Sequence, residues 1–258
     1  MNLLKKKIIH LFLLISIPFI WLGWTNHIPE PGNGCIEEVY RIYKSMKLED
    51  VKEGNVYINY TQITHLKQVK VSDPGVSKTN VECIVGKNQM HYKSDEISVY
   101  MDSVDNFTVV PIRKTIFWSN SLLEKRKKER VNGFNILQDS LFSVCKLINC
   151  RQEYNVEEGY NKIVEMAPVE RATKLFQYRK VVFYVNTETQ TIKKIYLEFL
   201  PKFEYTGIEL IYNKIEKNYL KEKLNSPVKK IFVSANNQLK GDYKDYKLVD
   251  NRVGSRLR

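Results

Sequence analysis

The stretch Lys180–Leu200, KVVFYVNTETQTIKKIYLEFL, decides the fold. Apolar residues alternate with more polar ones on both sides of a polar interval, at Val181, Phe183 and Val185 and at Ile195, Leu197 and Phe199. A period of two is typical of strands that bury one face. The interval, Asn186–Gln190, is short and polar enough to close a hairpin. We therefore predict two antiparallel strands, 180–186 and 191–200, joined by a turn.

Alternation of the same kind recurs on both sides of this hairpin. Upstream it marks six short segments, at 56–61, 81–85, 89–93, 97–101, 107–112 and 116–118. Two more segments, 160–166 and 208–217, flank the hairpin. Turn-forming residues separate several of the upstream segments, namely Asp73-Pro74-Gly75, Gly86-Lys87-Asn88 and Ser94-Asp95-Glu96. We predict that consecutive strands pair as an antiparallel meander.

Two other segments show helical spacing. The first is a short amphipathic helix ending near Lys47, with apolar residues at Ile36, Val39, Tyr40, Tyr43 and Met46. The second covers 122–149, with an apolar stripe at Leu137, Leu141, Val144, Cys145 and Ile148. Helices before and between groups of strands indicate an α+β fold. We predict one large curved antiparallel sheet with helices on a single face.

The N-terminus is an export signal or a membrane anchor. Lys5, Lys6 and Lys7 precede an apolar run, 8–24, which as a helix is ~25 Å long, slightly shorter than a bilayer core. Gly23-Trp24-Thr25 matches a signal-peptidase site poorly. Both a cleaved signal and a retained anchor therefore fit the sequence. Because three lysines stand directly before the run and no Lys or Arg follows it until Arg41, the positive-inside rule places the remaining chain outside the cytoplasm.

The sequence predicts four consecutive regions. Residues 1–25 are the signal or anchor, and residues 26–34, NHIPEPGNG, form a linker rich in proline and glycine. Residues 35–250 form the folded domain, and residues 251–258 a basic tail.

The net charge of +12 first suggests a nucleic-acid partner. Residues 1–25 hold three of the lysines and no acid, and an exported domain rarely meets genomic DNA, so we expect no nucleic-acid partner. The densest basic run is Lys125, Arg126, Lys127, Lys128 and Arg130. It is either a solvated face or a contact for anionic headgroups or an acidic partner, to which Arg252, Arg256 and Arg258 could add.

Cysteine and histidine spacing supports no metal centre. His10, His27, His65 and His91 lack any zinc spacing, and so does Cys145-x4-Cys150. Four cysteines in an oxidising compartment permit disulfides, whose pairing stays open. A bridge from Cys145 to Cys150 requires the helix to stop near Asn149, and we interpret Cys145 as a small buried hydrophobe.

Catalytic motifs are also missing from the sequence. Ser143-Val144-Cys145-Lys146 and Ser226-Pro227-Val228-Lys229 match S-x-x-K but lack the accompanying motifs of that enzyme class. G-x-S-x-G, G-x-G-x-x-G and P-loop patterns do not occur. We expect no enzyme activity and no cofactor.

The order of elements resembles the periplasmic lipoprotein-carrier family, of the LolA and LolB type. Three segments carry the resemblance. Lys93–Tyr100, KSDEISVY, is like the family's aspartate turn leading into an aromatic strand, and 182–217 is like its paired strands. Asp242–Asp250, DYKDYKLVD, is like the family's terminal segment. The likeness spans most of 36–250.

The resemblance implies an unclosed β-barrel whose helices pack on its concave face and which holds the acyl chains of lipids or lipoproteins. Aromatic and apolar strand residues are core by default and become a ligand surface where the sheet curves around a space. The expected acyl contacts are Tyr57, Tyr60, Tyr92, Val99, Met101, Phe107, Trp118, Phe183 and Phe199. The expected setting is the periplasm or the inner membrane, with an anionic membrane surface or an envelope complex as a further partner.

One departure from the family pattern opens an alternative. Carriers of this type place a functional arginine on an early strand, where this chain offers only Lys87, so that role is not carried over. A retained anchor also suits a receiving or scaffold role. The alternative is a membrane-anchored envelope module that uses the same fold without a ligand.

Overall fold

The computed structural model describes residues 34–45, 55–67, 75–86, 88–121, 142, 144–170, 178–201, 204–220, 224 and 227–252. Its first strands are β1 (Asn55–Leu66), β2 (Val76–Val85), β3 (Met90–Ser94), β4 (Ser98–Met101), β5 (Asp105–Val110) and β6 (Thr115–Asn120). The others are β7 (Cys145–Asn155), β8 (Tyr160–Pro168), β9 (Tyr178–Asn186), β10 (Thr191–Phe199), β11 (Tyr205–Tyr219) and β12 (Lys247–Asp250). The helices are α2 (Gly34–Ser45), α6 (Lys229–Phe232) and the 3-10 turns η2 (Pro111–Arg113) and η3 (Gly241–Tyr243). No helix among these residues is long and apolar enough to cross a membrane.

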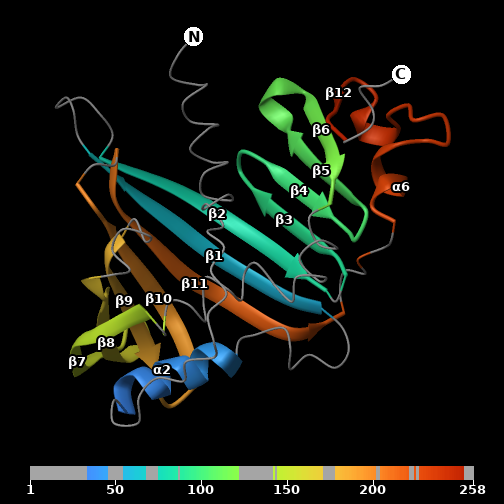
Figure 1. Ribbon diagram of the computed structural model, residues 1–258. Helices are drawn as coiled ribbons and strands as arrows, with labels where there is room; N and C mark the ends of the chain where they lie inside the picture. Colours follow the sequence, from blue (N-terminus) through green and yellow to red (C-terminus); the bar gives the residue numbers. More distant parts are fainter. Residues whose placement is uncertain are drawn as a thin grey trace.

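All twelve strands belong to one open, twisted sheet (Figure 1). The order is β12-β6-β5-β4-β3-β2-β1-β11-β10-β9-β8-β7, so the edge strands β12 and β7 do not close on each other. Strands β1–β6 form the predicted antiparallel meander. The prediction of a wholly antiparallel sheet is wrong at one edge, because β12 returns along β6 in parallel and makes the sheet mixed.

The predicted hairpin is confirmed. Asn186 pairs with Thr191, and β9 and β10 run antiparallel from there. The Asn186 side-chain oxygen accepts a hydrogen bond of 2.8 Å from the Thr189 backbone N–H, which stabilises the turn. Gln190 completes it with a positive φ of 52°.

The second predicted helix is confirmed at Phe142 and Val144, which are helical, and is wrong from Cys145 onward. Residues 145–149 begin β7, which pairs with β8. The pairing passes from Leu147 to Asn149 across a bulge, so the inward side chains, Cys145, Leu147 and Cys150, have irregular spacing. Ile148, expected on a buried stripe, is 52% exposed. The earlier part of that prediction, 122–141, lies outside the described residues.

Helix α2 confirms the first helical prediction and covers one end of the sheet. Its buried residues Ile36, Val39, Ile42 and Tyr43 pack on strands β8–β10, against a group that includes Val164, Phe183 and Ile195. These three strand residues are partners in register, so their side chains share one face. We call this side of the sheet the α2 face.

Helix α6 packs on the opposite face. Phe232 contacts Phe107 at a ring-centroid distance of 4.7 Å and Tyr100 at 5.0 Å. Tyr100, Phe107 and Trp118 are register partners, and following the pairs across β1–β5 places them on the side away from α2. The prediction that the helices share one face is therefore wrong. With so few helical residues the described fold is mostly β rather than α+β.

Candidate functional site

The α2 face carries a continuous apolar row across the middle of the sheet. Ile58, Cys83, Tyr92 and Val99 are register partners on β1, β2, β3 and β4. In the next row Tyr60 pairs with Val81 on one side and with Tyr212 on the other, and the two tyrosine rings lie 6.0 Å apart. Paired residues point to the same side of a sheet, so these strands present one apolar surface.

This surface connects two separate apolar clusters. The first contains α2 and residues of β7–β10, as described above. The second consists of residues from β3–β6 and the turn before β4, namely Ile97, Val99, Met101, Val110, Met90, Tyr92 and Phe117. Neither α2 nor α6 contributes to the second cluster. The half of the α2 face at β3–β6 is thus built from strands alone, among the described residues.

The polar atoms within this surface stay neutral at physiological pH. Burial raises the pKa of the Cys83 thiol to about 12 and that of the Tyr212 hydroxyl to about 12. Burial also raises the pKa of Tyr60 and of Tyr92. Groups that do not ionise can stay in contact with hydrocarbon at much lower cost than charged ones.

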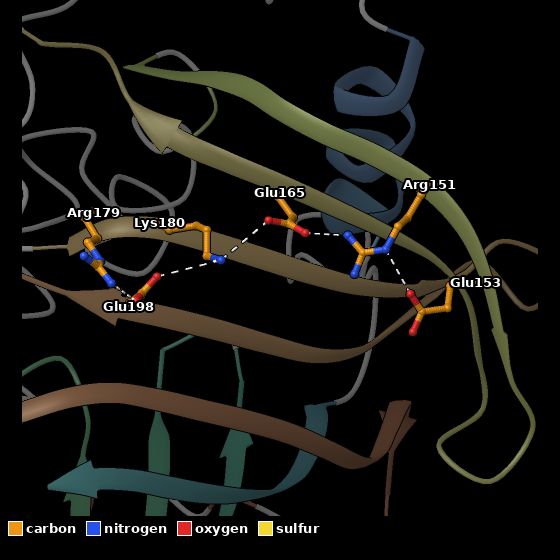
Figure 2. A network of polar contacts seen from close by, with 6 residues as sticks. All are labelled: Arg151, Glu153, Glu165, Arg179, Lys180 and Glu198. Carbon is orange, nitrogen blue, oxygen red and sulfur yellow. Dashed lines mark hydrogen bonds and ion pairs between the residues drawn. The ribbon is translucent and has the colours of Figure 1, made fainter.

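The opposite side of the same sheet carries a line of charged side chains (Figure 2) beside a buried apolar cluster that includes Ile163 and Val182. Across β7–β10, on the face away from α2, six side chains form a chain of ion pairs, namely Arg151, Glu153, Glu165, Lys180, Glu198 and Arg179. The hydrogen bond from Arg151 lowers the pKa of Glu165. Val164 and Phe183 of the same strands point the other way, into the α2 cluster. This part of the sheet therefore holds apolar clusters on both sides, and the chain of ion pairs lies on the side away from α2.

The structure places six of the nine expected acyl contacts on the α2 side, namely Tyr60, Tyr92, Val99, Met101, Phe183 and Phe199. It does not bring the other three to them. Phe107 and Trp118 lie in the core beneath α6, stacked at 5.1 Å, and Tyr57 lies on the same side. The sequence held a signal for this separation, because Tyr57 and Tyr60 are an odd number of positions apart on one strand.

The expected headgroup contacts 125–130 lie outside the described residues. In the basic tail, Arg252 lies 3.3 Å from the centroid of the Trp118 ring and pairs with Asp250 at 2.6 Å. Arg256 and Arg258 lie beyond the described part. Within the described residues no group of three or more His, Cys, Asp or Glu could hold a metal ion.

Cysteine pairing is a feature that the sequence did not predict. Cys35 of α2 forms a disulfide with Cys150 of β7, 115 positions away. Cys83 and Cys145 are free and buried, as predicted for Cys145. Lys162 of β8 pairs with Glu38, and Lys217 of β11 donates to the Ser45 carbonyl at the helix end. Helix α2 is therefore fastened to the sheet along its length.

Comparison with known proteins finds solved structures of low sequence identity to this chain. No family model and no curated protein matches the chain. Among solved structures, it is similar to an uncharacterized conserved protein from Thermus thermophilus, at 7% identity and a TM-score of 0.41, covering 83% of this chain and 98% of that one. The lipoprotein LppX of Mycobacterium tuberculosis matches at 9% identity and a TM-score of 0.41, covering 73% and 98%. A LolA superfamily protein from Nitrosomonas europaea matches at 14% identity and a TM-score of 0.31, covering 72% and 94%. These neighbours include a protein of the LolA superfamily, to which the sequence shows a resemblance.

Proposed function

We propose that this protein is a non-enzymatic, carrier-like protein of the cell envelope that binds acyl chains of lipids or lipoproteins on the α2 face. The observation that supports this most is the apolar row Ile58, Cys83, Tyr92 and Val99, which joins two apolar clusters of an unclosed sheet. The acyl contacts are the six residues of the α2 side, and the chain lies along the row between the clusters.

Hydrocarbon burial supplies the affinity in this proposal. Each buried methylene contributes roughly 0.8 kcal/mol, so about a dozen give ~10 kcal/mol before the cost of association is subtracted. The neutral hydroxyls of Tyr60, Tyr92 and Tyr212 set few polar constraints, which suits a ligand defined by its chain rather than its headgroup.

The proposed location is the periplasm or the outer surface of the inner membrane. Residues 1–25 are the signal or anchor, 26–34 the linker, 35–250 the carrier-like domain and 251–258 the tail. The Cys35–Cys150 disulfide supports an oxidising compartment. Lys125, Arg126, Lys127, Lys128 and Arg130 hold the domain near anionic headgroups in this proposal.

The test is photo-crosslinking of the full chain in lipid nanodiscs with a diazirine-bearing palmitate, followed by mapping of the labelled peptides. We expect label on Tyr92, Val99 and Met101, and none on Trp118 of the other face. Excess unlabelled palmitate should remove the label. Label spread equally over both faces, or resistant to competition, would contradict a specific acyl site.

A second candidate function is an envelope interaction module with a solid core. The fastening of α2 by Cys35–Cys150, Glu38–Lys162 and Lys217 favours it, because a fixed helix resembles a permanent cover more than a lid. In that case palmitate leaves the α2 face unlabelled, and the full chain is recovered from membranes within a larger complex. Mass spectrometry of the mature N-terminus adds a second discriminator, since a start near Asn26 favours a soluble carrier.

A further inference from the structure

A small hollow lies on the side of the sheet opposite the proposed acyl site. Its volume is about 120 Å³, and its lining residues are Tyr57, Glu82, Ile84, His91, Lys93 and Tyr219. An apolar cavity of about 150 Å³ is known to admit one benzene molecule, so this smaller hollow, which is open to solvent, can take a six-membered ring only in part. It sits over β1–β3, between the cluster under α6 and the ion pairs of Figure 2.

The walls of the hollow are the rings of Tyr57 and His91, and each ring stacks on a further tyrosine. Tyr57, Ile84 and His91 are register partners on β1, β2 and β3, so the backbones that carry Tyr57 and His91 are about 10 Å apart, two strand spacings, with buried Ile84 between them. Tyr219 stacks on Tyr57 at 5.0 Å, and Tyr100 stacks on His91 at 4.0 Å.

Polar groups line the adjacent row. Glu82 pairs in register with Lys93, two residues along from Ile84 and His91, and the Tyr57 hydroxyl donates to Glu82 at 3.3 Å. Beyond them lies a row of neutral amide and hydroxyl side chains, joined by hydrogen bonds of 2.9–3.2 Å, namely Asn59, Asn213, Thr61 and Asn80. Such groups both donate and accept hydrogen bonds.

We propose that this surface binds a glycan, with one pyranose ring between Tyr57 and His91 and the next sugar over the amide row. A ring that carries hydroxyl groups can satisfy the Glu82 carboxylate, the Lys93 ammonium and the amides together. An acyl chain or a phenyl ring would desolvate these polar groups without offering them hydrogen bonds, and this desolvation costs binding free energy. The site is independent of acyl binding, because it lies on the other face of the sheet.

The experiment is a titration of the full chain, in nanodiscs free of glycoside detergent, with chitotetraose and with maltotetraose. The readout is the ring Cε1–H NMR signals of the histidines. We expect the signal of His91 to shift with sugar concentration. His65 serves as an internal control, since it lies on the same face but outside the hollow, paired with Glu209 at 2.6 Å. Preference for chitotetraose assigns the ligand to amino-sugar glycans, and preference for maltotetraose to neutral hexoses.

Variants separate stacking from nonspecific adhesion. Y57A should weaken binding at least tenfold, while Y154A, which removes a 73% exposed tyrosine from the edge strand β7, should leave it within twofold. K93A, at an exposed rim position, should weaken binding without affecting the fold and covers the case in which Y57A unfolds. Absence of a His91 shift with both sugars at millimolar concentration, or equal affinity in Y57A, K93A and Y154A, overturns the proposal.

Discussion

The Asp102 side chain accepts a hydrogen bond of 2.7 Å from the backbone N–H of Val228, 126 positions further along the chain. Its other carboxylate oxygen accepts two bonds of 2.8 Å, from the backbone N–H groups of Val104 and Asp105. Asp102 is 2% exposed. One buried carboxylate therefore both closes the β4–β5 turn and fixes the start of α6.

Replacing Asp102 by alanine should lower the free energy of unfolding by about 3 kcal/mol. The substitution leaves the Val228 and Asp105 N–H groups without acceptors in a buried place and the Val104 N–H in a partly buried one, and each buried loss costs on the order of 1 kcal/mol or more. Urea denaturation measures the change. D245A, at an exposed aspartate of the same region, should stay within about 0.5 kcal/mol. Equal effects of both variants would show that the Asp102 bonds do not stabilise the fold.

Opening the Cys35–Cys150 disulfide should destabilise the protein by about 3–5 kcal/mol. The bridge closes a loop of 115 positions, and closing so long a loop lowers the conformational entropy of the unfolded chain, which favours the folded state. Thermal unfolding of a C35S/C150S double variant measures the effect, with reduced wild type as a second sample. Both samples should unfold alike, and a C145A variant should keep most of the stability. Peptide mapping without reductant should recover Cys35 joined to Cys150.

Native protein at pH 8 should not react with a disulfide reagent such as DTNB. Burial raises the pKa of Cys83 to about 12 and that of Cys145 to about 11, so the thiolate fractions at pH 8 are about one in ten thousand and one in a thousand. Two thiols should react once urea unfolds the chain.

The raised thiol pKa values also make stability depend on pH. The thiols lose their protons at lower pH in the unfolded state than in the native state, so the free energy of unfolding should fall as pH rises above about 8.5. A fast-reacting thiol in the native state would contradict this burial.

The Glu165 carboxylate should stabilise the fold above pH 5 and cease to do so in acid. Arg151 lowers its pKa, so the contribution is present above the ordinary carboxylate pKa of ~4.3 and is lost as pH falls through the lowered value. The pair is partly exposed, which limits the effect to about 1 kcal/mol or less. Stability curves of wild type and E165Q should therefore differ at pH 7 and converge near pH 2. High salt at pH 7 should narrow the same difference.

Charge reversal at Lys125, Arg126, Lys127 and Lys128 should weaken binding to anionic vesicles while leaving thermal stability nearly unchanged. Attraction between surface charges is screened over ~8 Å at physiological salt, so wild-type binding should also decline as salt rises. Vesicle flotation measures both effects. Binding that is the same for wild type and variant, or constant with salt, would leave the run as a solvated face.

Regular strands were predictable from the sequence because apolar and polar residues alternate in them without a break. In the β9–β10 hairpin, Val181, Phe183 and Val185 all point to the α2 side, so the sequence period equals the structural one. Strand β7 fails this condition. Its bulge between Leu147 and Asn149 shifts the inward positions, and the resulting spacing imitates a helix.

Long-range features of the fold could not be predicted in the same way. The residues around Cys35 and Cys150 do not indicate that the two form a disulfide, because the pairing depends on where α2 packs on the sheet. The face chosen by α6 depends likewise on Asp102 and Phe107, more than a hundred positions earlier. For the candidate site, the prediction selected residues by type and did not use the side of the sheet, which is why Trp118 was grouped with Tyr92.

The pairing of β1 with β11 has a consequence for how the chain folds. Val56 and its neighbours on β1 lack their β11 partners, such as Ile211 and Ile215, until about 150 more residues have been synthesised. The nascent meander therefore has an open edge until β11 is made, and an open edge is the state in which strands most readily pair with the wrong molecule. Because so much of the sheet depends on this distant closure, folding should be slow, on the scale of other proteins rich in non-local strand pairs. Assembly of the sheet, rather than its final stability, is then the step at which this protein most needs a chaperone.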